Sequence, residues 1–533
     1  MDPDANKRQD PPCSRFVGDD GAPGRRCGRA RTQQEGSMQI TPYGSVLADV
    51  TGGRVVGFVD NDGMKVFRGI PYAAAPYGAN RFKAPQPVVP WDGERDATTF
   101  GPSTYQIEPL FRGHGFNYRA IMSPGWRPGD ETLNLNIWTP GEAGDNLPVL
   151  VYIHGGAFLT GNGGLPAYDG HHLAERGAVY VSIHYRTGTE GFGAFEGAAT
   201  NRGLRDQIAA LTWVQENIAR FGGDPDRVMV HGESAGGMSI ALLLASPAAD
   251  GLFHRAIVQS GSSPMADSPE LAADRARRIA AALGTEPTAE AIAAVDQKTL
   301  LDTALPALAE NHTDRWDMLA LGPWVDGEIV PEDLDTAMLA RPVRPTIWGT
   351  NRDEGNLFLI TPDMMSTATE ETLAGYLMAS HGAVEPLRTM LLERARIHEP
   401  GMAMAQHLSW TTFTGPTMTA VDQLAGDGRP TWLYRFDYAS RANDGRAQAC
   451  HMSEFPFVWD NLDSPAHRQM TGPNPPQRLA TEMADAWVRF AATADPGWPA
   501  FTDPQRIGRV FDTTSRDVPG LDQELWRAWT NQG

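Results

Sequence analysis

Residues 227–237 have the sequence RVMVHGESAGG, and this stretch decides the fold. Its first five residues form a short apolar run that predicts a buried strand, and the apolar residues 235–245 directly behind it predict a helix. Between them lies the pattern Gly-x-Ser-x-Gly, which is typical of a strained strand-to-helix turn that exposes a serine hydroxyl at a helix N-terminus. Such a pattern also arises by chance in a glycine-rich chain, so its position between strand and helix is what favours Ser234 as a nucleophile.

On both sides of this turn, strand-like runs alternate with helix-like runs. Strands are predicted at 147–153, 179–184, 256–259, 346–348 and 431–438, and helices at 206–221 and 478–492. Because these strands are continuously apolar, they predict an α/β fold with a mostly parallel central sheet flanked by helices, which binds ligands at the carboxyl ends of its strands. The helical segments at about 265–340 and 361–425 interrupt the pattern and are predicted to be insertions over the active site.

The composition limits the class of protein and its partners. Of the 533 residues 41% are hydrophobic and 21% are charged, with 56 Gly and 41 Pro, which is typical of a loop-rich globular protein. The formal net charge of -20 repels phosphate backbones, so we expect no nucleic-acid partner. No apolar run approaches the roughly 18 residues of a membrane-spanning helix, so we expect no membrane span.

The first 37 residues differ in character from the rest. They are rich in Gly, Pro, Asp and Arg and almost devoid of apolar residues, which predicts a disordered N-terminal extension at 1–37 before a single domain at 38–533. The extension lacks the apolar core of a secretory signal. The body holds one cysteine, Cys450, and cannot close an internal disulfide, so we expect a cytoplasmic location, with secretion left open.

A glycine-rich loop follows the predicted strand at 147–153. Its sequence, HGGAF at 154–158, lets the backbone approach a substrate carbonyl and present N–H donors to a developing oxyanion. Losing one such donor typically costs about 3 kcal/mol of transition-state stabilisation. We expect the oxyanion hole to consist of the backbone N–H groups of Gly156, Ala157 and Ala235, and His154 to brace the loop rather than to transfer protons.

Several motifs in a shared order resemble the type B carboxylesterase and lipase family. They are FRGIPY at 67–72, LNLNIW at 133–138, HGGAF at 154–158 and GESAGG at 232–237. The resemblance runs from about Gly44 to the C-terminus and implies an α/β-hydrolase fold with a deep active-site gorge. The chain departs from the family at Thr132, where many members have a disulfide-forming cysteine, and at His184, where they have asparagine.

The resemblance also indicates the partners of the serine, which follow it in the order acid, then histidine. The segment 349–355 is similar to the acid-bearing turn of the family and points to Glu354, with Asp353 as the alternative; the segment 450–457 points to His451. Cys450 lies beside this histidine and is interpreted as a small buried residue.

Two further acids accompany this predicted triad. Glu233 lies next to the serine and Glu454 lies three residues after the histidine. Both are expected to be buried carboxylates near Ser260, either supporting the reaction or making structural hydrogen bonds only.

These residues together predict a serine carboxylesterase without a cofactor, acting on small, uncharged esters through an acyl-enzyme on Ser234. An amide or carbamate hydrolase, or a lipase, would use the same residues and stays an alternative; a non-catalytic binding module would be expected to lack the serine or the histidine.

Phe158 and the aromatic-rich stretch 111–126 either line the gorge or, as we favour, pack in the core. The pair His171-His172 lacks a third ligand at zinc-like spacing in the sequence, so no metal site is expected. The oligomeric state is not indicated.

Overall fold

The computed structural model describes residues 44–106, 126–262, 265–309, 320–360, 364–381, 385, 387–502 and 504–530. These residues belong to one compact unit of the chain. The extension predicted at residues 1–37 and most of the aromatic stretch at 111–126 lie outside the described residues. The single domain at 38–533 stays a prediction.

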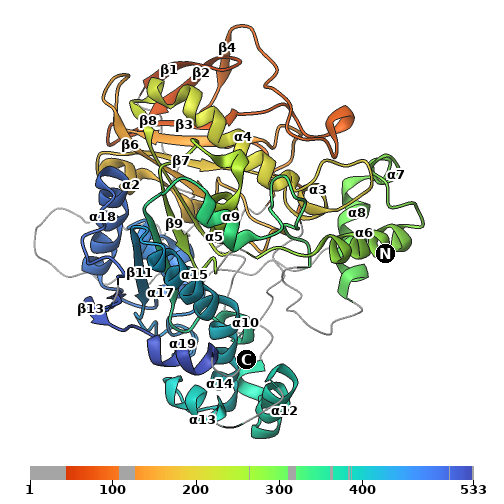
Figure 1. The fold of residues 1–533 in the computed structure, drawn as a ribbon. Helices are drawn as coiled ribbons and strands as arrows, with labels where there is room; N and C mark the ends of the chain where they lie inside the picture. Colours follow the sequence, from red (N-terminus) through yellow and green to blue (C-terminus); the bar gives the residue numbers. More distant parts are fainter. Residues whose placement is uncertain are drawn as a thin grey trace, which may run out of the picture. The chain divides into compact units, whose positions relative to one another are not determined.

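A thirteen-stranded sheet is the centre of the described structure (Figure 1). Its strands are β1 (Gly44–Val50), β2 (Gly53–Val59), β3 (Lys65–Pro71), β4 (Glu94–Asp96), β5 (Asn134–Thr139), β6 (Leu147–Ile153), β7 (Val179–Ile183), β8 (Gly223–Glu233), β9 (Arg255–Gln259), β10 (Thr346–Asn351), β11 (Thr431–Phe436), β12 (Ile507–Phe511) and β13 (Arg516–Pro519). Their order is β1-β2-β3-β5-β7-β6-β8-β9-β10-β11-β12-β13, with β4 paired to β2.

The seven neighbouring strands from β7 to β12 in this order pair in parallel. Their side chains are almost all buried, as continuous apolar runs predict, and the predicted α/β fold class is confirmed. Because the strands are parallel, the loops that follow β6, β8, β10 and β11 emerge at one edge of the sheet.

The N-terminal part of the sheet is antiparallel, which the strand pattern did not reveal. Strands β1, β2, β3 and β5 pair antiparallel in this order, and β5 pairs antiparallel with β7. The short strand β4 pairs parallel with β2. Only Thr51 and Gly52 connect β1 to β2, and Gly52 has a φ of +103°. Such a short connection allows only an antiparallel hairpin, because a parallel pair needs a long crossover.

Helices pack against this sheet in two groups. The first comprises α2 (His171–Glu175) and α18 (Gln477–Thr493), which contact each other. Helix α2 also contacts β5 and β7, and α18 contacts β6 and β8. The second comprises α3 (Gly188–Phe192), α4 (Arg202–Asn217), α5 (Ala235–Ala245) and α9 (Leu334–Ala340), of which α4 and α5 contact β8. Every residue of α5 is buried.

Helix α4 begins at Arg202 rather than at the predicted residue 206, because a buried cation stabilises its first turn. The Arg202 guanidinium is buried and donates to the carbonyl oxygens of Thr189, Glu190, Gly193 and Ala199. The apolar periodicity of the sequence cannot reveal a helix start held by a polar side chain.

The two predicted helical insertions are present. The first contains α6 (Pro269–Leu283), α7 (Ala289–Ala293) and α8 (Gln297–Ala309), which share a separate apolar cluster that includes Leu159. The second contains α11 (Met364–Thr367), α12 (Glu370–His381), α13 (Leu387–Arg394), α14 (Pro400–Leu408) and α15 (Gly415–Gly426), preceded by α10 (Asn356–Ile360). The remaining helices are α16 (Phe455–Val458), α17 (Pro465–Thr471) and α19 (Gln523–Thr530). No helix among the described residues is long and apolar enough to cross a membrane.

Candidate active site

Ser234 lies at a strained turn between β8 and α5. Its φ of 55° and ψ of -126° fall in a region that non-glycine residues rarely adopt, at a cost of roughly 1–3 kcal/mol. The glycines on either side allow the turn to form: a Cβ on Gly236 would lie 2.0 Å from the Ile153 carbonyl oxygen, and one on Gly232 would lie 2.8 Å from the carbonyl carbon of Gly236. This is the geometry of a nucleophile elbow.

The glycine-rich loop after β6 packs directly against this elbow. A Cβ on Gly155 would lie 3.1 Å from the Cβ of Ser234, so the two segments approach as closely as a glycine allows. Gly156, Ala157 and Phe158 have successive positive φ values of 111°, 56° and 60°. Among the described residues, the N–H groups of Gly156, Ala157 and Ala235 have no hydrogen-bond partner, which leaves all three predicted donors available to an oxyanion.

His154 has the bracing position predicted for it. Its buried ring stacks on Tyr185 at a centroid distance of 4.3 Å, and its Nδ1 lies 2.8 Å from the carbonyl oxygen of Gly155. Burial lowers the pKa of His154 to about 4, so the ring is neutral at pH 7. Phe158 packs in the core against Phe192, with ring centroids 5.1 Å apart.

The structure brings Glu354 and His451 together across 97 residues of sequence. His451 Nδ1 lies 2.6 Å from Glu354 Oε2, and both side chains are buried. The other carboxylate oxygen of Glu354 accepts from the Asn351 N–H at 2.7 Å and from the Ser260 hydroxyl at 2.5 Å. The acid is therefore held in place through both of its oxygens.

Asp353, the alternative acid, faces another part of the structure. Its carboxylate accepts from Gln406 Nε2 at 2.6 Å and from the Ala449 N–H at 3.3 Å, and it lies 3.6 Å from Arg396. It makes no hydrogen bond to His451 within the described residues. The geometry therefore favours Glu354.

The other ring nitrogen of His451 faces Glu233. His451 Nε2 lies 3.1 Å from Glu233 Oε1, and the Ser234 hydroxyl has no hydrogen bond to His451 among the contacts of the described residues. Catalytic hydrogen bonds are often long or absent without substrate and form in the complex. Ser234 and His451 thus belong to one site, because His451 contacts Glu233, the residue directly before the serine.

The carboxylates around His451 change its protonation. Burial alone would lower the pKa of His451, but the nearby Glu233 and Glu354 outweigh it and raise this pKa to about 9. Burial raises the pKa of Glu233 well above its usual range. Glu233 and His451 therefore compete for one proton. Burial, reinforced by Glu354, raises the pKa of Glu454 to about 7.

Glu454 is buried as predicted, and its hydrogen-bond partners are Asn351 and Gln259. Glu454 accepts from Asn351 Nδ2 at 2.5 Å and from Gln259 Nε2 at 3.4 Å, whereas the Ser260 hydroxyl donates to Glu354. Cys450 is fully buried, and burial raises the pKa of its thiol, so it is not a thiolate nucleophile.

The sequence did not predict one segment that contacts the loop of Glu354 and the ring of His451. Residues Ser409–Thr414 form a π-helical turn between α14 and α15. From it, Ser409 Oγ accepts from the Gly355 N–H at 2.8 Å, and the Phe413 ring packs on the His451 ring at 4.7 Å. The segment 409–414 has no recognisable signal, because the extra residue in the turn is set by packing.

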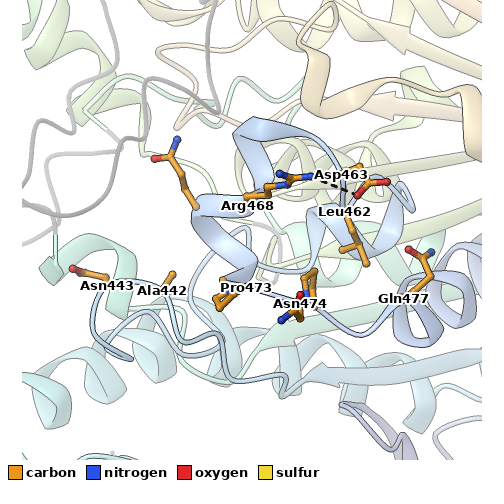
Figure 2. Close-up of a pocket in the computed structure, with 11 residues that line it drawn as sticks. Ala442, Asn443, Leu462, Asp463, Arg468, Pro473, Asn474 and Gln477 are labelled. Atoms are coloured by element: carbon orange, nitrogen blue, oxygen red, sulfur yellow. Dashed lines mark ion pairs between the residues drawn. The ribbon is translucent and has the colours of Figure 1, made fainter. Parts of the chain in front are cut away.

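A surface hollow of about 770 Å³ lies elsewhere and contains none of the candidate site residues (Figure 2). It lies beside α17, and the ion pair between Arg468 and Asp463 crosses part of it at 3.8 Å. Its lining residues are Ala442, Asn443, Leu462, Asp463, Arg468, Gln469, Gly472, Pro473, Asn474, Pro475 and Gln477. Its lining contains no histidine, serine or cysteine, so it lacks the nucleophile and imidazole base that the site at Ser234 combines.

An elbow serine, a glycine-rich donor loop and an acid–histidine pair at the carboxyl ends of parallel strands define the α/β-hydrolase class. The model of the carboxylesterase family matches residues 44–513. This chain belongs to the carboxylesterase family and is a carboxylic ester hydrolase, as the sequence predicts.

Characterised relatives and solved structures agree with this placement. The chain is 36% identical to the para-nitrobenzyl esterase of Bacillus subtilis (strain 168), covering 86% of this chain and 94% of the relative. It is 32% identical to human carboxylesterase 3, covering 90% and 87%. The crystal structure of a Geobacillus stearothermophilus carboxylesterase superposes with a TM-score of 0.79 at 34% identity, covering 91% of this chain and 99% of that one.

Proposed function

We propose that this carboxylesterase forms an acyl-enzyme on Ser234, with His451 as general base and Glu354 as the acid that orients it. The observation that carries the proposal is the 2.6 Å contact between His451 Nδ1 and Glu354 Oε2 beside the strained serine. Glu354 accepts a hydrogen bond from the Nδ1–H group of His451 and thereby leaves Nε2 as the ring nitrogen that takes up a proton.

In the first half of the reaction, the Ser234 hydroxyl transfers its proton to His451 Nε2 as Oγ attacks the ester carbonyl carbon. For this step Nε2 exchanges its contact with Glu233 for one with the serine. The carbonyl oxygen becomes an oxyanion that accepts from the N–H groups of Gly156, Ala157 and Ala235.

The tetrahedral intermediate then collapses, and the leaving alkoxide takes the proton from His451 and departs as the alcohol. A water molecule repeats the sequence on the acyl-enzyme: it gives a proton to His451, attacks the carbonyl carbon and releases the acid. Ser234 recovers its proton at the end, so atoms and charges balance over the cycle.

Small, uncharged esters fit this proposal best. The body of the protein is acidic, with a formal net charge of -20 over the whole chain, and repels anionic acyl groups at long range. A cytoplasmic location stays a prediction, which cell fractionation would test.

Hydrolysis of p-nitrophenyl esters of increasing acyl length, followed by intact mass after an organophosphate inhibitor, tests the proposal. We expect turnover and one covalent adduct, located on Ser234 by peptide mapping. Turnover with the adduct on another residue would contradict the assignment. A series of p-nitroanilides with the same acyl groups separates ester from amide preference.

A further inference from the structure

A second cluster of histidine and carboxylate side chains lies on α2 and contains none of the candidate active-site residues. One ring nitrogen from each of His171 and His172 and one carboxylate oxygen of Glu175 all lie within 4.8 Å of one another. The sequence predicted an isolated histidine pair, and this was wrong because the helix returns Glu175 to the same face as His171, four residues later.

A buried carboxylate orients the first of these histidines. His171 Nδ1 lies 2.9 Å from Asp60 Oδ2, and the Asp60 side chain is only 8% exposed. The other oxygen of Asp60 accepts the N–H groups of Asp62 and Met64 at 3.0 and 2.9 Å. Asp60 is thus fixed in the turn between β2 and β3, and it requires the proton of His171 to be on Nδ1.

In the neutral imidazole, a proton on Nδ1 leaves the lone pair of His171 on Nε2. This nitrogen faces Asp62, whose Oδ2 lies 3.8 Å away and whose side chain is 79% exposed. A carboxylate that holds one nitrogen of a histidine while the other faces further ligands is the arrangement that orients metal-binding histidines.

We propose that His171, His172 and Glu175 bind a divalent transition-metal ion such as Zn²⁺, with Asp62 or water as the fourth ligand. Two imidazoles and a carboxylate suit Zn²⁺, whereas Ca²⁺ and Mg²⁺ prefer oxygen ligands. Ligand atoms around a tetrahedral Zn²⁺ lie roughly 3.4 Å apart for bonds of about 2.0–2.2 Å. The side chains of His172 and Glu175 are 47% and 63% exposed, so they have room to move from separations of up to 4.8 Å to the separation that a bound ion requires.

The neighbouring charges favour a cation at this position. Three carboxylates, those of Asp60, Asp62 and Glu175, surround two imidazoles. The nearby guanidinium of Arg176 does not compete for them, because it pairs with Asp460 and Asp485. A bound ion would link the β2–β3 turn to α2 and so stabilise the fold, without contact with the residues proposed for catalysis.

Titration of the full chain with ZnCl₂, followed by calorimetry and thermal unfolding, tests the proposal. Cys13 and Cys27 are replaced by serine in every sample so that thiols outside the site do not bind the metal. We expect one Zn²⁺ per chain and a rise of Tm over the same protein in chelator, with ester turnover unchanged. A protein that binds no Zn²⁺ would overturn the proposal.

Two variants locate the ion. His172→Gln removes a ligand, and we expect it to lose the Zn²⁺-dependent rise of Tm. Asp60→Asn keeps an amide oxygen that accepts the N–H groups of the turn, but its amide N–H donates to His171 Nδ1 and so moves the imidazole proton to Nε2. We expect about 10–100-fold weaker Zn²⁺ binding, as for other residues that support a metal ligand. Each variant is compared with its own metal-free form, so a loss of stability is not mistaken for a loss of metal.

His398→Gln is the matched control, because His398 is an exposed histidine outside the cluster. It should bind Zn²⁺ as the parent does. Co²⁺ in place of Zn²⁺ should give the visible spectrum of a tetrahedral site without thiolate charge transfer. Equal affinity in His172→Gln, Asp60→Asn and the parent would show that the ion binds elsewhere and would overturn the proposal.

Discussion

The protein contains two carboxylate–histidine pairs with nearly the same local geometry and different surroundings. Glu354 holds His451 Nδ1 at 2.6 Å, and Asp60 holds His171 Nδ1 at 2.9 Å. The His451 side chain is 3% exposed and its Nε2 faces Glu233 beside a strained serine, whereas the His171 side chain is 19% exposed and its Nε2 faces Asp62. The carboxylate orients the imidazole in both places, and the groups facing Nε2 decide which chemistry follows.

The largest effect is expected from removing Ser234, the nucleophile that only the Glu354–His451 pair has beside it. Ser234→Ala should lower kcat for p-nitrophenyl esters by a factor on the order of 10^4 or more, because triad members act as a unit. The variant should keep the wild-type Tm or exceed it, since alanine removes no packing contact. Turnover close to wild type would contradict the assignment of Ser234.

Exchanging each carboxylate for its amide tests the comparison directly. Glu354→Gln should lower kcat by about 10^4, because the amide stabilises the wrong imidazole tautomer and cannot stabilise the imidazolium. Steady-state kinetics and circular dichroism on the same samples separate this effect from misfolding.

Two matched variants complete this test. Asp60→Asn should leave kcat unchanged, and Asp353→Asn should lower it far less than Glu354→Gln, because Asp353 contacts Gln406 and not His451. If Asp353→Asn proved the more damaging change, the acid would be reassigned.

A smaller effect is expected on the pH dependence. Ester hydrolysis needs neutral His451, whose pKa is raised to about 9, so kcat/KM should rise with pH through the range 7–9. Glu233→Gln removes the carboxylate that contributes most to this rise, so the acidic limb should move to lower pH. Glu454→Gln is the control and should move it less; identical profiles for all three proteins would contradict the proposed coupling.

Much of the site could be predicted from local sequence. The elbow at 232–236, the loop at 154–158 and the strands that carry them depend on glycines and on continuous apolar runs, which act within a few residues. Glu354 and His451 needed the family resemblance, because a single acid among many carries no local signal. The antiparallel N-terminal strands escaped prediction since strand direction depends on connections and partners.

The sequence by itself determined where the chain turns, which strands are buried and which serine lies at a strained elbow, because these depend on backbone sterics and apolar pattern. Only the tertiary structure decided which carboxylate meets which imidazole. Glu354 and Asp353 are neighbours in sequence, yet one contacts His451 and the other contacts Gln406. Asp60 reaches His171 across 111 residues. Such pairs depend on how distant loops converge at the sheet edge, which short-range rules do not encode.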